Sequence, residues 1–223
     1  MINSPFSLRN KNILVIGQGE ICDSICSFCR DDGAVVLTEE LVDDIDSFVN
    51  DSPLFNCLSI NIDISQSVLS QYLSRESMIR SLNSNVINQI LLVKSLLKKK
   101  KLCKGGTIVF TSSLSGIDNV HYADSLNALS AGAISSIIKC LALEFASKGI
   151  RVNHVRYGIV MTNELLSNQV LSPKELEEKQ KFFPLRRFGK PIDVAGAVLF
   201  LLSDASTWIT GTSLRVDGGY SVL

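Results

Sequence analysis

The sequence predicts an α/β fold: a doubly wound parallel sheet with helices on both of its faces. Two observations indicate this class. Short, continuously apolar runs of the kind found in buried parallel strands recur along the chain. Between them lie longer stretches whose apolar residues recur at helical spacing, so that strands and helices alternate. Such alternation is typical of βαβ units, in which each connecting helix packs back onto the sheet.

The first strand is predicted by the apolar run NILVIG, which ends in Gly17. Residues 19–32 then carry a helical apolar stripe that a glycine closes. A strand, a glycine turn and a helix are what a dinucleotide site needs, because turn amides and the helix dipole point at the pyrophosphate. Gly17 and Gly19 are therefore candidate cofactor-binding residues. Glu20, near the helix start, satisfies the helix N-terminus itself and would repel a phosphate.

Three cysteines, Cys22, Cys26 and Cys29, lie on this predicted helix with the spacing of the iron–sulfur motif of radical-SAM enzymes. On a helix they would spread over about 10 Å at a rise of about 1.5 Å per residue, too far for neighbouring irons. We therefore expect three small apolar side chains that face the sheet. His154, inside a later strand, is likewise expected to be buried and bonded to the backbone.

Residues 34–38 predict the second strand. Glu39 or Glu40, just past its end and about 20 residues beyond the glycine turn, stands where an acidic group can bond an adenine ribose. An acidic helix start is the alternative, because residues 41–49 have the pattern of a short amphipathic helix. Residues 58–63 then predict another apolar strand.

The second half of the chain continues the alternation with a long helix over 79–101, a strand over 107–112 and a long helix over 127–147. The lysines that end the first of these helices suit its C-terminal dipole and solvent, not nucleic acid. A further strand, GIRVNHVRYG, follows. Ser172 and Pro173 then predict a helix start, with serine as the N-cap and proline at the first helical position.

Composition limits the class of protein. With 223 residues and 46% apolar content, residues 1–223 are expected to form one globular domain with a full core. The 22 basic and 22 acidic residues balance, which disfavours nucleic acid and anionic membranes as partners. No apolar run reaches the ~20 residues that span a bilayer, and the N-terminus lacks a signal-peptide core. Six irregularly spaced cysteines suggest reduced thiols, so we expect a cytoplasmic protein.

Two parts of the chain carry a family resemblance. One reads GGTIVFTSS, then NALSAGAISSIIKCLALEF, then GIRVNHVRYGIVMT; the other is the C-terminal PLRRFGKPIDVAGAVLFLLSDASTWITG. Both resemble the short-chain dehydrogenase/reductase family, closest in pattern to its β-ketoacyl-carrier-protein reductase branch. The resemblance implies a Rossmann-like sheet and NAD or NADP as the cofactor.

One element of that family is missing. The strand over 58–63 resembles the family's NNAG strand, whose second asparagine, here Asn61, lies about 24 residues before the active-site asparagine, here Asn85. The resemblance makes Asn61 a candidate cofactor-binding residue. The family's third strand, at the sheet edge, therefore has no counterpart, and a six-stranded sheet is expected. The adenine pocket loses a wall, and Asp63 replaces a glycine that lies close to the cofactor.

The resemblance assigns the chemistry only in part. Ser113 matches the serine that holds the substrate carbonyl, and Asn85 the asparagine that anchors a water relay. The family's proton-transferring tyrosine falls on Asn127, and its lysine on Ala131. An amide has no useful pKa and alanine has no charge, and loss of a general acid typically slows catalysis ~10²–10⁴-fold.

Other residues could replace the missing groups. Tyr122 and His121 precede Asn127, and either ring could do acid–base work beside Ser113; alternatively both line a loop over a vacant pocket. Thr162 matches a threonine that contacts the cofactor's carboxamide or phosphate. Tyr157 replaces the family's proline and would fill space that a nicotinamide occupies.

Three functions remain open. The first is a catalytically inactive family member, a pseudoenzyme that acts through oligomer or partner contacts. The second is an NAD(P)-dependent oxidoreductase on a carbonyl or alcohol with rearranged acid–base residues, and the third a lyase or dehydratase in the same cleft. The resemblance implies a lid over 163–187. It also implies a homodimer or homotetramer through the helices at 79–101 and 127–147, possible also as a mixed assembly with an active relative.

Overall fold

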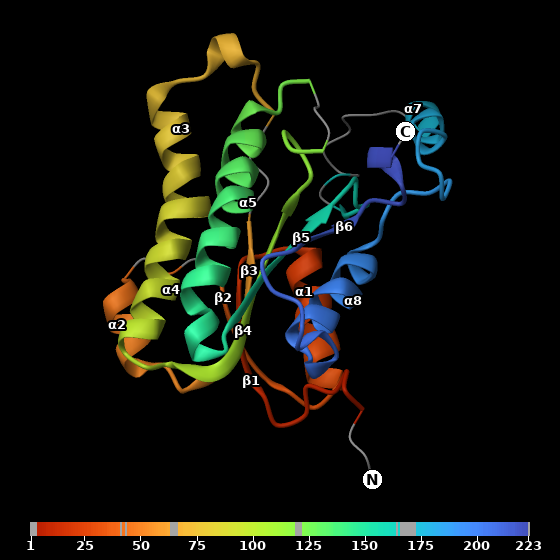
Figure 1. The fold of residues 1–223 in the computed structure, drawn as a ribbon. Helices are drawn as coiled ribbons and strands as arrows, with labels where there is room; N and C mark the ends of the chain where they lie inside the picture. Colours follow the sequence, from red (N-terminus) through yellow and green to blue (C-terminus); the bar gives the residue numbers. More distant parts are fainter. Residues whose placement is uncertain are drawn as a thin grey trace.

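The computed structural model describes residues 4–40, 42, 44–62, 67–118, 122–163, 165 and 173–222. Its centre is a six-stranded, fully parallel sheet in the order β2-β1-β3-β4-β5-β6, with helices on either side of it (Figure 1). The strands are β1 (Asn12–Ile16), β2 (Val35–Glu39), β3 (Phe55–Asn61), β4 (Leu102–Ser113), β5 (Arg151–Tyr157) and β6 (Ser213–Val216).

Helices cover both faces of the sheet, as the doubly wound fold requires. One layer consists of α1 (Glu20–Asp31) and α8 (Pro191–Leu202), which pack against each other. The other layer consists of α2 (Ile45–Asp51), α3 (Arg75–Leu82), a π-helical turn (Asn83–Ile87), α4 (Asn88–Lys98) and α5 (Ser125–Phe145). In Figure 1 this second layer stands on the left of the sheet, and α1 and α8 stand on the right.

Alternation along the strands builds two cores. In β1, Leu14 and Ile16 belong to the cluster under α2, α4 and α5. Ile13 and Val15 point the other way, into the cluster under α1 and α8. Because successive side chains of a strand face opposite sides of the sheet, a run that is apolar at every position predicts burial on both faces. All four of these side chains are buried.

The predicted six-stranded sheet is confirmed, and β2 lies at its edge. The edge position leaves Val35 67% exposed. The chain passes from β2 to β3 through α2, which packs on α4 in the opposite layer. Within the described residues, the layer of α1 and α8 therefore has no helix beyond α1 on the side of β2.

The long helix predicted over 79–101 differs from the observed one in both extent and form. It begins at Arg75, because Ser74 and Ser77 form a reciprocal capping box that satisfies the first amides. It ends at Lys98, and a π-helical turn separates α3 from α4. Periodicity does not reveal such a turn, because one extra residue shifts the apolar stripe only locally.

The short helix predicted over 41–49 begins later than expected. The side chain of Asp44 accepts a 3.0 Å hydrogen bond from the Ser47 amide, so α2 runs over Ile45–Asp51. Glu39 is the last residue of β2. The alternative that Glu39 and Glu40 begin a helix is therefore wrong.

The expectation that no apolar stretch could span a membrane is wrong by length and composition. Ser125–Lys148 forms a helix of 24 residues that contains an 18-residue window with a mean hydropathy of 1.6, which is sufficient on those two criteria. Core helices of folded domains meet the same criteria, and α5 packs on β4 and β5 with Ile134 and Ile138 fully buried. Its apolar character follows from that packing.

Candidate functional site

The glycine turn joins β1 to α1 in the conformation that glycine permits. Gly17 has a φ of +117° and Gly19, the N-cap of α1, a φ of +85°. A Cβ atom on Gly17 would lie 3.0 Å from both the Cβ and the carbonyl oxygen of Asn61, whereas one on Gly19 would meet open space. Packing against β3 therefore requires a glycine at the first position, and backbone conformation favours one at the second.

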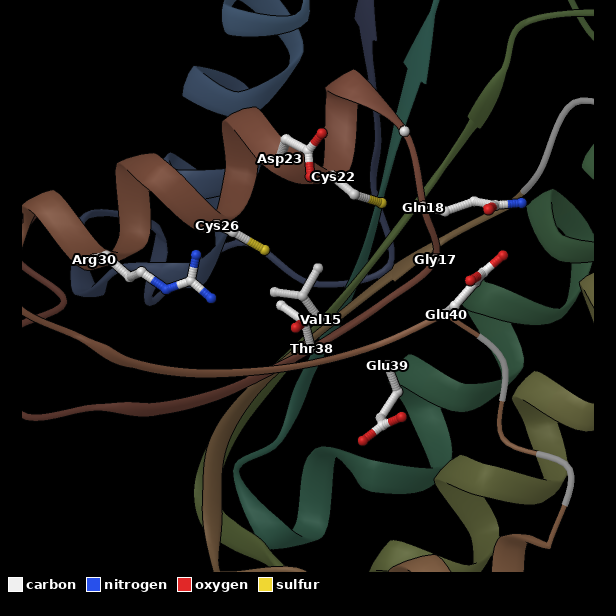
Figure 2. A pocket seen from close by; sticks show the side chains of 11 residues that line it. Val15, Gly17, Gln18, Cys22, Asp23, Cys26, Arg30, Thr38, Glu39 and Glu40 are labelled. Carbon is white, nitrogen blue, oxygen red and sulfur yellow. The ribbon is translucent and has the colours of Figure 1, made fainter.

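A pocket of 370 Å³ opens beside this turn, between α1 and β2. Figure 2 shows Cys26 and Arg30 directing their side chains from α1 toward Val15 and Thr38 on the sheet. The full lining consists of Val15, Gly17, Gln18, Gly19, Cys22, Asp23, Cys26, Arg30, Thr38, Glu39 and Glu40. Among the described residues, no helix beyond α1 covers this side of the sheet.

Glu39 and Glu40 both line the pocket at the end of β2. Their carboxylates diverge, that of Glu39 turning toward the helical layer that contains α5 and α4 (Figure 2). Contact of Glu39 with a ribose stays a prediction. The pocket lining contains one basic residue, Arg30, and three acidic ones, Glu39, Glu40 and Asp23. The pocket is therefore acidic.

Asn61 links three strands by hydrogen bonds at the carboxyl ends of the strands, close to the glycine turn. It is 8% exposed; its Nδ2 donates to the carbonyl of Ile16 at 2.9 Å, and its Oδ1 accepts from Thr111 Oγ1 at 2.5 Å. The side chain therefore links β3 to β1 and β4. Its predicted contact with a cofactor is not tested by this arrangement, and Asp63 lies outside the described residues.

Glu20 makes a contact that its place in the sequence does not reveal. The Asn163 amide, 143 residues away, donates to Glu20 Oε1 at 2.5 Å. Thr162, the candidate cofactor-binding threonine, accepts a 3.2 Å hydrogen bond from the Leu165 amide through its own hydroxyl. The start of α1 and the segment that follows β5 are thus joined by a carboxylate.

Ser113 and Asn85, the candidate catalytic residues from the family pattern, lie on β4 and in the helical layer beside α5. Ser113 ends β4, and its Oγ accepts a 3.1 Å hydrogen bond from the Ser115 amide. Asn85 lies in the π-helical turn and is 4% exposed. A buried amide in a local irregularity of a long helix is a frequent feature of functional sites. Catalytic roles for both stay predictions.

The two positions that the family resemblance aligns with its tyrosine and lysine are buried. Asn127 and Ala131, one turn apart on α5, are 7% and 2% exposed. Asn127 Nδ2 donates to Asp124 Oδ1 at 2.5 Å, and the Ser115 hydroxyl donates to the other oxygen of the same carboxylate. The sequence reasoning missed Asp124; its place three residues before Asn127, on one helical face, was the available signal.

The residues that could replace the family's tyrosine are Tyr122 and His121. Tyr122 is 87% exposed, so its role as a replacement acid stays a prediction. His121 lies outside the described residues. Tyr157 is 5% exposed and packs into the core beneath α1 and α8 with Val155 and Val160. Its ring therefore fills interior space at the end of β5, beside Ser113 on β4.

His154 is fully buried, as predicted, but its partners are hydroxyl groups and not backbone. Its Nε2 lies 2.9 Å from Ser112 Oγ and its Nδ1 3.5 Å from Ser213 Oγ. Burial, and to a smaller extent the nearby positive charge of Arg156, lowers its pKa from 6.5 to about 3. The imidazole is therefore neutral at pH 7 and belongs to the sheet interior.

The cysteines of α1 are buried, as expected. All six cysteines of the chain are free thiols, and desolvation raises the pKa of Cys29 to about 12. In the part of the chain that the structure describes, no three His, Cys, Asp or Glu residues are grouped as a metal site would require.

The chain matches known proteins over most of its length. A family model described as enoyl-(acyl carrier protein) reductase matches residues 34–221. An uncharacterized oxidoreductase of Bacillus subtilis, YmfI, is 34% identical over 189 residues, which are 85% of this chain and 72% of the relative. A 7α-hydroxysteroid dehydrogenase of Escherichia coli K12 is 36% identical over 116 residues, 52% of this chain. That match spans 44% of the E. coli enzyme, and the match to a tropinone reductase homolog of Arabidopsis thaliana spans 36% of it.

Solved structures agree with the sequence matches. A short-chain dehydrogenase family protein of Francisella tularensis superposes with a TM-score of 0.83 at 27% identity, covering 96% of this chain and 100% of the other. ElxO with NADP bound shares the fold, with a TM-score of 0.81 at 24% identity over 96% of this chain and 100% of its own. The family model and the YmfI match together establish that this chain belongs to the short-chain dehydrogenase/reductase family.

Proposed function

We propose that this chain is a non-catalytic member of its family that acts through contacts with its own copies or with a partner protein. One observation carries the proposal. The two α5 positions that would supply the family's phenol and ammonium hold Asn127 and Ala131, both buried. The Asn127 amide is committed to Asp124, and the methyl group of Ala131 offers neither a proton nor a charge.

These replacements remove two contributions to the family's reaction. A positioned general acid contributes typically ~10²–10⁴-fold to the rate, and an amide cannot replace it. The lysine that lowers the tyrosine pKa also holds the nicotinamide ribose in this family, so its loss removes a cofactor contact. The acidic mouth of the neighbouring pocket adds repulsion toward phosphates. We therefore expect weak affinity for NAD and NADP.

An exposed apolar face supports action through protein contacts. Along the layer of α3, the π-helical turn, α4 and α5, large apolar side chains are 39–80% exposed: Ile79, Ile87, Leu91, Leu129 and Leu143. Pairing of these helices across a two-fold axis would bury them. We propose a homodimer or homotetramer, or a mixed assembly with an active relative. Six free thiols favour the cytoplasm as its location.

Two catalytic alternatives each have one observation in their favour. Tyr122 lies in the connection between Ser113 and α5, so its phenol could reach the cleft and support an oxidoreductase. Asp124, hydrogen-bonded to Ser115 and Asn127, supplies a carboxylate for acid–base chemistry without a nicotinamide, as a lyase or dehydratase would need.

The deciding experiment is titration of the purified protein with NADH and NADPH by calorimetry, combined with turnover assays on carbonyl compounds, alcohols and hydroxyacyl compounds. We expect dissociation constants in the millimolar range for both nucleotides, and no turnover. Micromolar binding with turnover that Tyr122→Phe abolishes would replace the proposal with an oxidoreductase. Turnover without nucleotide that Asp124→Asn abolishes would replace it with a lyase.

A further inference from the structure

We propose that Glu20 is a built-in anion that takes the place of a cofactor phosphate and closes the nucleotide cleft of this chain. The inference deepens the proposed function, because it names the group that keeps the dinucleotide out. It rests on one contact that joins distant parts of the chain, on the position of Glu20 at a helix start and on the charges that surround the turn.

Glu20 is the first residue of α1, directly after the glycine turn. The first amides of a helix have no partner within the helix, and together with the dipole they attract an anion. The N-cap residue Gly19 has no side chain with which to cap them. In this fold the anion attracted there is the pyrophosphate of the dinucleotide. In this chain, a carboxylate is covalently attached at the same place.

The segment that follows β5 holds that carboxylate from the other side. The Asn163 amide donates to Glu20 Oε1 at 2.5 Å, although the two residues are 143 positions apart. Asn163 follows Thr162, the position at which the family resemblance expects a contact to the cofactor's carboxamide or phosphate. An oxygen of a carboxylate and one of a phosphate accept the same hydrogen bond. A phosphate that entered here would have to displace Glu20 from this amide.

The charges that surround the turn also oppose the binding of a phosphate. Asp23, Glu39 and Glu40 line the neighbouring pocket, where Arg30 lies at the far end, away from the turn (Figure 2). A displaced Glu20 carboxylate would remain beside the entering phosphate, because its Cα atom belongs to the first turn of α1. The carboxylate and the phosphate are both negative and would repel each other, and this repulsion weakens as the salt concentration rises.

The test compares three variants in NADPH calorimetry at constant salt. Glu20→Ser removes both the charge and the acceptor that reaches Asn163, whereas Glu20→Gln keeps an oxygen that can still accept the bond. Asp31→Asn is the matched control, because it removes the same charge from the exposed far end of the same helix. We expect NADPH affinity to rise at least tenfold in Glu20→Ser, less in Glu20→Gln and not at all in Asp31→Asn.

Amide hydrogen exchange without nucleotide supplies an independent readout. The Asn163 amide should exchange at least tenfold faster in Glu20→Ser and at the wild-type rate in Asp31→Asn. Unchanged NADPH affinity in both Glu20 variants overturns the inference, and so does micromolar binding by the wild-type chain. The proposed function fails separately, if the wild-type chain turns over a substrate. An inactive wild-type protein whose Glu20 variants gain no affinity would refute only this inference.

Discussion

Single residues at the carboxyl edge of the sheet show how tightly the glycine turn is packed. Gly17 adopts a φ of +117° while the Cβ and carbonyl of Asn61 approach its Cα face. Asn61 itself is held by Ile16 and Thr111, so it cannot move aside without breaking two hydrogen bonds. The turn therefore belongs to the core as well as to the candidate cofactor site.

We predict that Gly17→Ala lowers the free energy of unfolding by about 1–3 kcal/mol, because it forces both an unfavourable φ and a contact near 3.0 Å. Gly196→Ala is the matched control, since Gly196 lies inside α8 and a Cβ there meets nothing within 4 Å. That variant should gain up to about 1 kcal/mol from helix propensity. Urea denaturation measures both; equal effects of the two substitutions would contradict this account.

His154 makes the stability of the protein depend on pH. Its folded pKa of about 3 lies below the ordinary value of 6.5, so folding favours the neutral ring. The stabilisation is complete above pH 6.5 and is lost as pH falls toward 3, because the unfolded chain binds a proton that the folded chain rejects. At pH 5 the loss amounts to about 2 kcal/mol for this one group.

In His154→Gln, the free energy of unfolding should fall by about 2 kcal/mol less between pH 7 and pH 5 than it does in the wild-type protein. This difference is independent of how the substitution changes stability at pH 7. Urea denaturation at several pH values measures the difference in slope between the two proteins. Carboxylates contribute equally to both and cancel in the comparison. If the two slopes are the same, the titrating group lies elsewhere.

At the scale of elements, the edge strand β2 is the consequence of the missing family strand. The Val35 amide donates to Lys11, and the Glu39 carbonyl accepts from Gly17, so alternate residues of β2 bond to β1. In a parallel ladder the residues between them direct their amides to the other side. Val36 and Thr38 therefore present amides to the open edge.

We predict that the amides of Val36 and Thr38 exchange with solvent at least ~10²-fold faster than the Leu37 amide, because edge amides need no global opening. Hydrogen exchange resolved by residue measures this directly. Equal protection of all three amides would show that another chain or segment pairs with this edge, and β2 would then be an interaction surface.

At the scale of the whole molecule, the two helical layers differ in how much apolar surface they leave open. The layer of α3, α4 and α5 exposes Leu91 by 41% and Leu129 by 39%. Single exposed apolar residues are ordinary, whereas a row of them along neighbouring helices is what a protein interface would be expected to have. The proposed assembly through these helices follows from this face.

We predict that Leu91→Asp and Leu129→Asp each shift the mass measured by multi-angle light scattering from an oligomer to the monomer. A buried, unpaired carboxylate at a two-fold interface is repeated by symmetry and opposes association. Val35→Asp places the same charge on an exposed apolar position of β2 and should leave the mass unchanged. A wild-type monomer, or an oligomer that both variants retain, would contradict the proposed interface.

The six-stranded sheet was expected from the family resemblance, whereas local patterns in the sequence determined the alternation of strands and helices and the burial of Cys26 and His154. They did so because burial repeats with the period of a strand or helix, which neighbouring residues reveal. The alignment of Asn127 and Ala131 with the family's tyrosine and lysine is likewise a prediction from the sequence alone.

Only the tertiary structure decided which distant groups meet. Strand order and twist bring Glu20 to the Asn163 amide, and they bring His154 between the hydroxyls of Ser112 and Ser213. The Ser115–Asp124 contact depends on the path of a connecting loop, for which the sequence has no periodic signal. These contacts follow from how the whole chain packs, because hydrogen bonds between remote segments form only after the sheet has fixed their positions.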